Sequence, residues 1–168
     1  MPSKTQSIGI GVAVSVILSL VLGFVAYNAG TAGQTIAGCA GCLVALAAPM
    51  VAVWHYTSTF SLTIPAGQGA GLGAAVGALG AVVGGLLQRL LISIGVFPDP
   101  VEAAREIYEQ QGMSPEQIEQ AMTMVEAFSN PVMGLVIGLV IGAVVGAIGG
   151  AIGAAIFKKG ANADDYEV

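Results

Sequence analysis

Charged side chains are scarce in this sequence. Asp, Glu, Lys and Arg make up 9% of its 168 residues, whereas an ordinary soluble domain carries about 25%. Basic residues are the scarcest, with five Lys and Arg in total, so the sequence has no basic patch that could bind a nucleic acid. We therefore expect neither a water-soluble domain nor a nucleic-acid-binding protein.

The chain also has few of the residues on which catalytic and metal sites depend. It contains one histidine and two cysteines, and two thiols alone make a poor structural zinc site. Its long apolar stretches hold no Asp or Glu, which excludes proton or sodium translocation through a carboxylate in the membrane. We expect no catalytic site, no metal site and no cofactor.

What the sequence has in abundance is apolar residues. They make up 55% of the chain, and the mean hydropathy is +0.85. Four stretches exceed the ~18 apolar residues that indicate a membrane span; they cover about 8–27, 35–56, 66–97 and 131–157. The sequence thus predicts an all-α membrane protein with four transmembrane helices. The first three would occupy residues 1–97.

A connection at residues 98–130 carries most of the acidic residues and has two sequence patterns typical of the capping box at a helix N-terminus. In each, Asp or Ser is followed by Pro and then, two residues later, by Glu or Gln; the patterns are Asp99-Pro100-Val101-Glu102 and Ser114-Pro115-Glu116-Gln117. Gly112 stands where a helix C′ residue belongs. We expect an extramembrane helical hairpin over 100–111 and 115–129.

Both hairpin helices have an apolar stripe that a small hairpin cannot bury alone. These stripes must face each other, the membrane surface or a partner. Methionine, which adapts to irregular interfaces, is frequent there. The candidate partner-binding residues are Ile107, Tyr108, Met113, Ile118, Met122, Val125 and Phe128.

Glycine recurs at every fourth residue along two of the four spans. The strips are Gly69, Gly73, Gly77 and Gly85, with Ala81 completing the spacing, and Gly134, Gly138, Gly142, Gly146 and Gly150. Glycine costs about 1 kcal/mol relative to alanine inside a water-soluble helix, but in lipid it lets two helix backbones approach closely. We expect these glycine strips to pair spans three and four within one chain, or to pair copies of the chain.

The last third of the chain resembles a known family. The run Glu109-Gln110-Gln111-Gly112-Met113-Ser114-Pro115-Glu116-Gln117-Ile118-Glu119-Gln120-Ala121-Met122 is followed by Phe128, Pro131 and an apolar span that ends in Lys158-Lys159. Over 109–159 the sequence is similar to an uncharacterised, Bacteroidetes-type bacterial family, a domain of unknown function of small four-span membrane proteins. The glycine content of the last two spans departs from that family. The resemblance implies a topology and supplies no chemistry.

Cys39 and Cys42 form a Cys-Ala-Gly-Cys sequence near the expected start of the second span. A pair with this spacing at a helix N-terminus can be redox-active. Membrane oxidoreductases that form disulfides use a second cysteine pair as well, which this chain lacks. We favour a packing role beside Gly38 and Gly41, and keep thiol redox chemistry as an alternative.

Five residues are candidate anchors at the membrane–water interface. Trp and Tyr concentrate there, and arginine near a span end can reach it by extending its side chain. Arg89 could instead contact the acidic hairpin or serve a ligand or gating role. The candidate anchors are Trp54, Tyr56, Arg89, Lys158 and Lys159.

Four spans place both termini on one side of the membrane. Lys4 and the pair Lys158-Lys159 lie on that side, and lysine-rich ends favour the cytoplasm. We expect both termini, including a tail at 158–168, to be cytoplasmic in the bacterial inner membrane. The function we favour is that of a non-enzymatic accessory or assembly subunit in a hetero-complex. The alternatives are a thiol redox protein and a small homo-oligomeric channel.

Overall fold

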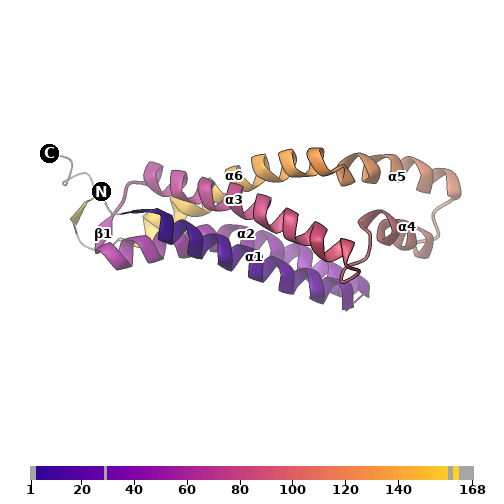
Figure 1. Cartoon of the computed structure of the whole chain (residues 1–168), viewed down its shortest axis with the longest axis horizontal. Helices are drawn as coiled ribbons and strands as arrows, with labels where there is room; N and C mark the ends of the chain where they lie inside the picture. Colours follow the sequence, from indigo (N-terminus) through magenta and orange to yellow (C-terminus); the bar gives the residue numbers. More distant parts are fainter. Residues whose placement is uncertain (1–2, 29, 159–160, 163–168) are drawn as a thin grey trace.

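The computed structural model describes residues 3–28, 30–158 and 161–162, and its elements are almost entirely helical (Figure 1). This confirms the all-α class. The six helices of the described part are α1 (Thr5–Asn28), α2 (Gly30–Phe60), α3 (Ala66–Ser93), α4 (Pro100–Gln110), α5 (Pro115–Ser129) and α6 (Pro131–Ile156).

Four of these helices form an antiparallel bundle and have the length and composition of membrane spans. Their apolar stretches run 24 to 28 residues, more than the ~20 needed to cross a bilayer. Helices α1 and α3 run one way, and α2 and α6 run the other (Figure 1). The protein is therefore a multi-pass membrane protein, with the α4–α5 hairpin outside the spans.

The second and third spans have boundaries that differ from those expected. Helix α2 continues to Phe60 and has Pro49 inside it, which membrane helices tolerate because neighbouring groups satisfy the freed carbonyl. Helix α3 ends at Ser93, because Gly95 takes a positive φ of 77°, a conformation that glycine adopts without penalty. The apolar residues up to Phe97 therefore form a loop.

Both hairpin helices begin at the predicted caps. Ser114 forms the full capping box with Gln117, in which Gln117 N donates to Ser114 Oγ and Ser114 N donates to Gln117 Oε1. At Asp99 the cap is a single bond, accepted from Val101 N at 2.8 Å, in place of the capping box we expected. Gly112 has a φ of +71° directly after the last turn of α4 and its cap residue, as predicted for a C′ glycine.

A two-stranded parallel ladder joins the α2–α3 connection to the segment after α6. Strand β1 (Leu62–Thr63) pairs with β2 (Ala161–Asn162), with Leu62 opposite Ala161. No sequence pattern indicates this pairing, since strands of two residues carry no detectable alternation. The ladder lies at the end of the bundle where the termini are (Figure 1).

The buried core also lies toward that end. Ala52 and Val53 of α2 and Val76 of α3 are fully buried, together with Tyr56 and Leu72 at 3% exposure. In the half of α1 nearer the hairpin, by contrast, most large apolar side chains are exposed. The bundle is thus tightly packed at the end near the termini and loosely packed at the end near the hairpin.

Glycine makes the closest contact in this structure, between the backbones of α3 and α6. Gly73 lies against Gly146 and Gly150, and Gly77 lies against Gly142. A Cβ added at Gly77 would stand 2.6 Å from the carbonyl carbon of Gly142, a distance that real Cβ atoms do not reach. Gly69 has the same relation to Gly150. Any side chain at these positions would force the two helices apart.

A second glycine face of α6 contacts α2. A Cβ at Gly149 would lie 2.5 Å from the carbonyl oxygen of Leu46, and one at Gly153 would lie 3.2 Å from the Cα of Met50. Helix α6 is consequently held on two sides by backbone contact, against α3 and against α2. The four-residue glycine spacing in the sequence predicts only the contact with α3.

We predict that Gly77→Ala lowers the stability of the folded protein in detergent by about 1–3 kcal/mol, the usual cost of overpacking. The matched control is Gly71→Ala on the same helix, where an added Cβ meets nothing within 4 Å. The control is expected to leave stability unchanged or raise it slightly. The measurement is equilibrium unfolding in mixed detergent micelles, and equal stability of the two variants would contradict the prediction.

Candidate functional site

The axes of helices α3 and α6 diverge toward the hairpin. At Gly138 an added Cβ would be 3.8 Å from the Cβ of Ala81, an ordinary contact, and at Gly85 it would meet nothing within 4 Å. Gly85 was expected to be a helix-packing residue, but it does not pack against α6 of the same chain, because the helices have already separated at its level. The separation opens a crevice beneath the hairpin, and Gly134 lies on its wall.

The crevice consists of two adjacent hollows that share part of their lining. One, of about 870 Å³, lies between α3, α5, α6 and the start of α4; the other, of about 940 Å³, lies between α1, α3 and α4 and reaches α6. Both volumes are in the range of small-molecule sites. The residues that line both hollows are Ala81, Gly85, Gln88, Ile92, Pro100 and Gly134.

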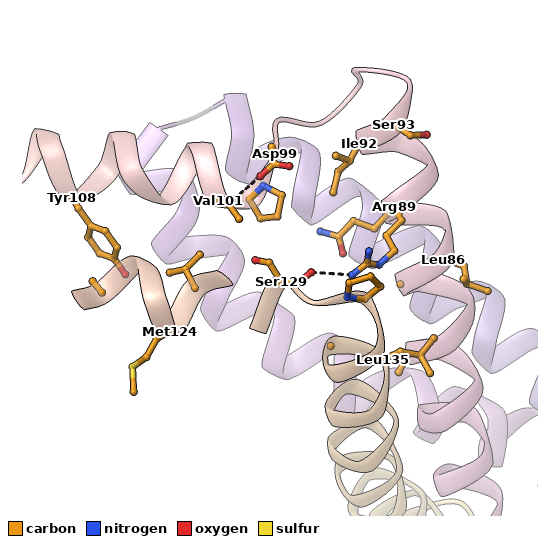
Figure 2. Close-up of a pocket in the computed structure, with 18 residues that line it drawn as sticks. Leu86, Arg89, Ile92, Ser93, Asp99, Val101, Tyr108, Met124, Ser129 and Leu135 are labelled. Carbon is orange, nitrogen blue, oxygen red and sulfur yellow. Dashed lines mark hydrogen bonds between the residues drawn. The ribbon is translucent and has the colours of Figure 1, made fainter. Parts of the chain in front are cut away.

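The first hollow combines apolar walls with a few polar groups near the hairpin. Leu86 of α3 and Leu135 of α6 form part of the apolar wall, and Arg89, Asp99 and Tyr108 lie around the same space (Figure 2). An apolar cavity with a small number of converging polar groups is the usual form of a binding site. We therefore take this crevice as the candidate site.

Arg89 links α3 to the joint between α5 and α6. Its Nη2 donates a hydrogen bond to the carbonyl oxygen of Ser129 at 3.2 Å (Figure 2). That carbonyl belongs to the last residue of α5, where the helix dipole favours a positive charge. Asn130 follows at once and caps α6 by accepting from Val132 N and Met133 N. Among the described residues, Arg89 has no further hydrogen-bond or ion-pair partner.

The seven candidate partner-binding residues do not form one surface in the structure. Ile118 and Met122 are 8% and 3% exposed, so they are not a free partner surface as we expected; they form the small core of the hairpin. The others lie elsewhere: Tyr108 and Val125 line the first hollow, Ile107 lines the second, and Met113 borders a separate hollow beside Arg105. The side chain of Phe128 lies outside the described part.

The two cysteines do not pack against another helix. Cys39 and Cys42 are both exposed free thiols, and added Cβ atoms at Gly38 and Gly41 would meet nothing within 4 Å. The packing interpretation is therefore wrong within this chain. The redox interpretation also loses its premise of a helix N-terminus, since α2 begins at Gly30, well before Cys39.

The expected interface anchors have different surroundings. Trp54 is 46% exposed, but Tyr56 is buried at 3%, with its ring edge-on to Phe60 at 5.3 Å. Tyr56 is thus a core residue rather than an exposed anchor, because it belongs to the buried cluster that α2 forms with α3 and α6. Lys158 is exposed, and Lys159 lies outside the described residues.

Sequence reasoning missed a polar contact between the first two helices. Ser7 is fully buried, and its Oγ lies 2.9 Å from His55 Nδ1. It also missed Gly149 and Gly153, although the Gly149-Gly150 pair was a signal, since adjacent residues of a helix face different neighbours. No group of three or more metal-ligating side chains occurs within the described ranges.

The comparison with protein families gives one match. The family model described as a protein of unknown function, DUF4199, matches residues 7–159. The chain belongs to this family, which confirms the resemblance seen in the last third and extends it to all four spans. No curated protein and no solved structure matches the chain.

We predict that Cys39 and Cys42 are dispensable. Both side chains are exposed and unpaired, so the double variant Cys39→Ser, Cys42→Ser should fold with a thermal midpoint in detergent within about 2 °C of the parent, as surface substitutions usually do. The same variant should leave thiol oxidation in the cell unchanged. Trapping of a mixed disulfide between either cysteine and another protein would contradict this.

Proposed function

We propose that the protein is a non-enzymatic integral membrane subunit that supports the assembly of a larger membrane complex. The observation that carries this proposal is the α4–α5 hairpin, which projects beyond one end of the four-helix bundle (Figure 1). Its helices are capped at Asp99 and Ser114, and Arg89 holds its last residue. A small folded unit fixed in this way offers a surface to another protein.

The chemistry of the hairpin indicates the kind of partner. Ile118 and Met122 are buried within it, and the side chains that remain exposed are mainly polar or charged. All seven acidic residues from Asp99 to Glu126 are exposed, and Arg105 is the only base among them. Such a surface favours a partner with a basic rim. Met124, 69% exposed, supplies an adaptable apolar contact.

The two alternatives have less support. A channel lined by glycine-rich helices requires the glycine faces to be free, but Gly73 and Gly77 lie against α6 of the same chain. Thiol redox chemistry has no observation in its favour beyond the two cysteines themselves. We therefore retain the accessory role, with the bacterial inner membrane as the proposed location and both termini in the cytoplasm.

We predict that the outer face of the hairpin touches a partner protein in native membranes. A photo-crosslinking residue at Gln120, which is exposed on α5, should give one discrete protein adduct. The matched control is the same residue at Val140, 54% exposed on α6, which should react with lipid. Adducts of Gln120 with lipid only, or a protein adduct from Val140 alone, would contradict the proposed surface.

The orientation is tested separately. We predict that Gln110→Cys, in the Cys39→Ser, Cys42→Ser background, reacts with a membrane-impermeant thiol reagent in intact spheroplasts. Ser3→Cys, exposed at the opposite end of the bundle, should react only after permeabilisation. The reverse pattern would show that the hairpin faces the cytoplasm.

A further inference from the structure

The crevice under the hairpin extends along α3 from a polar level to an apolar one. Helix α3 has 28 residues and is about 42 Å long at 1.5 Å per residue, whereas the hydrocarbon core is ~30 Å thick. Arg89 is four residues from the end of α3 at Ser93. It therefore lies near the level of the lipid headgroups, and the deeper part of the crevice lies level with the acyl chains.

The two hollows extend from this polar level into the membrane. The deep part of one is bounded by Ala81 and Leu135, and that of the other by Val16, Gly80 and Gly138. Both are lined by Gly85, where an added Cβ would meet nothing within 4 Å. Two adjacent apolar hollows below one polar region match a molecule with two chains and one headgroup.

The charges at the top of the crevice are mixed. Arg89 uses one donor on Ser129 O, and its guanidinium has five N–H donors, so it can also bind a phosphate. Asp99 lines the first hollow and Glu106 lines the second. A purely anionic headgroup would meet these carboxylates unfavourably. A headgroup with a phosphate and a primary ammonium satisfies both signs of charge.

We propose that this crevice binds one glycerophospholipid with a zwitterionic, primary-amine headgroup. The phosphate contacts Arg89, the ammonium donates to Asp99 or Glu106, and the two acyl chains occupy the two hollows. A choline headgroup fits less well, because its quaternary nitrogen has no N–H to donate. This binding site is independent of the proposed accessory role, and either can fail without the other.

The test is native mass spectrometry of the full chain, delipidated in mild detergent and titrated with single lipids. We expect phosphatidylethanolamine to bind in a 1:1 ratio and at least about tenfold more tightly than phosphatidylglycerol or phosphatidylcholine, the scale of one charge-assisted hydrogen bond. The soluble headgroup glycerophosphoethanolamine should bind far more weakly. Equal binding of all three lipids, or equal binding of the soluble headgroup, would overturn the proposal.

Two variants with matched controls locate the site. Arg89→Gln should weaken phosphatidylethanolamine binding about tenfold, whereas Arg105→Gln, which removes the same charge from a residue outside the crevice, should not. Gly85→Leu should fill space that both hollows border, whereas Gly71→Leu should not, although neither position has an atom within 4 Å of an added Cβ.

The thermal midpoint of each variant shows whether it is folded. If Arg89→Gln unfolds because it loses the bond to Ser129, the Gly85→Leu and Gly71→Leu pair still decides the matter. Unchanged lipid binding in folded Gly85→Leu would overturn the proposed place of the acyl chains, and with it the site. Retention of a protein segment instead of a lipid by the delipidated crevice would overturn it as well.

Discussion

The direct contact between the backbones of α3 and α6 is the constraint on which the rest of this structure depends. Lipid is as apolar as a leucine side chain, so no hydrophobic effect drives helices together within a bilayer. Attraction comes from close packing, and Gly73 and Gly77 lie with their backbones directly against those of Gly142 and Gly146. With Gly149 and Gly153 against α2, helix α6 is held by backbone contact on two sides.

The same contact explains why the opposite end of the molecule is open. The crossing brings the helices together near the termini and separates them toward Gly85 and Gly134. The space between them is covered by the hairpin, whose position is fixed by Arg89 on Ser129 and by the Asn130 cap of α6. Tight packing at one end thus leaves an open crevice at the other.

Much of this architecture could be predicted from the sequence, because its signals are local. Apolar length predicts the spans, and capping chemistry predicts the start of α4 at Pro100 and of α5 at Pro115. The surroundings of single side chains could not be predicted, because they depend on how helices rotate against each other. Tyr56 is therefore buried rather than interfacial, Ile118 and Met122 fill the hairpin rather than a partner surface, and the crevice follows from a divergence that no spacing records.

The central claim is that the glycine contact forms within one chain, and pulsed electron paramagnetic resonance tests it most directly. Spin labels at Gly71→Cys and Ile148→Cys, both exposed at the tightly packed end, would report the α3–α6 separation in the Cys39→Ser, Cys42→Ser background. The account predicts one narrow, short distance that persists when labelled protein is diluted with an excess of unlabelled protein. A distance that disappears on dilution would show that the glycine faces join different chains, and would contradict the account.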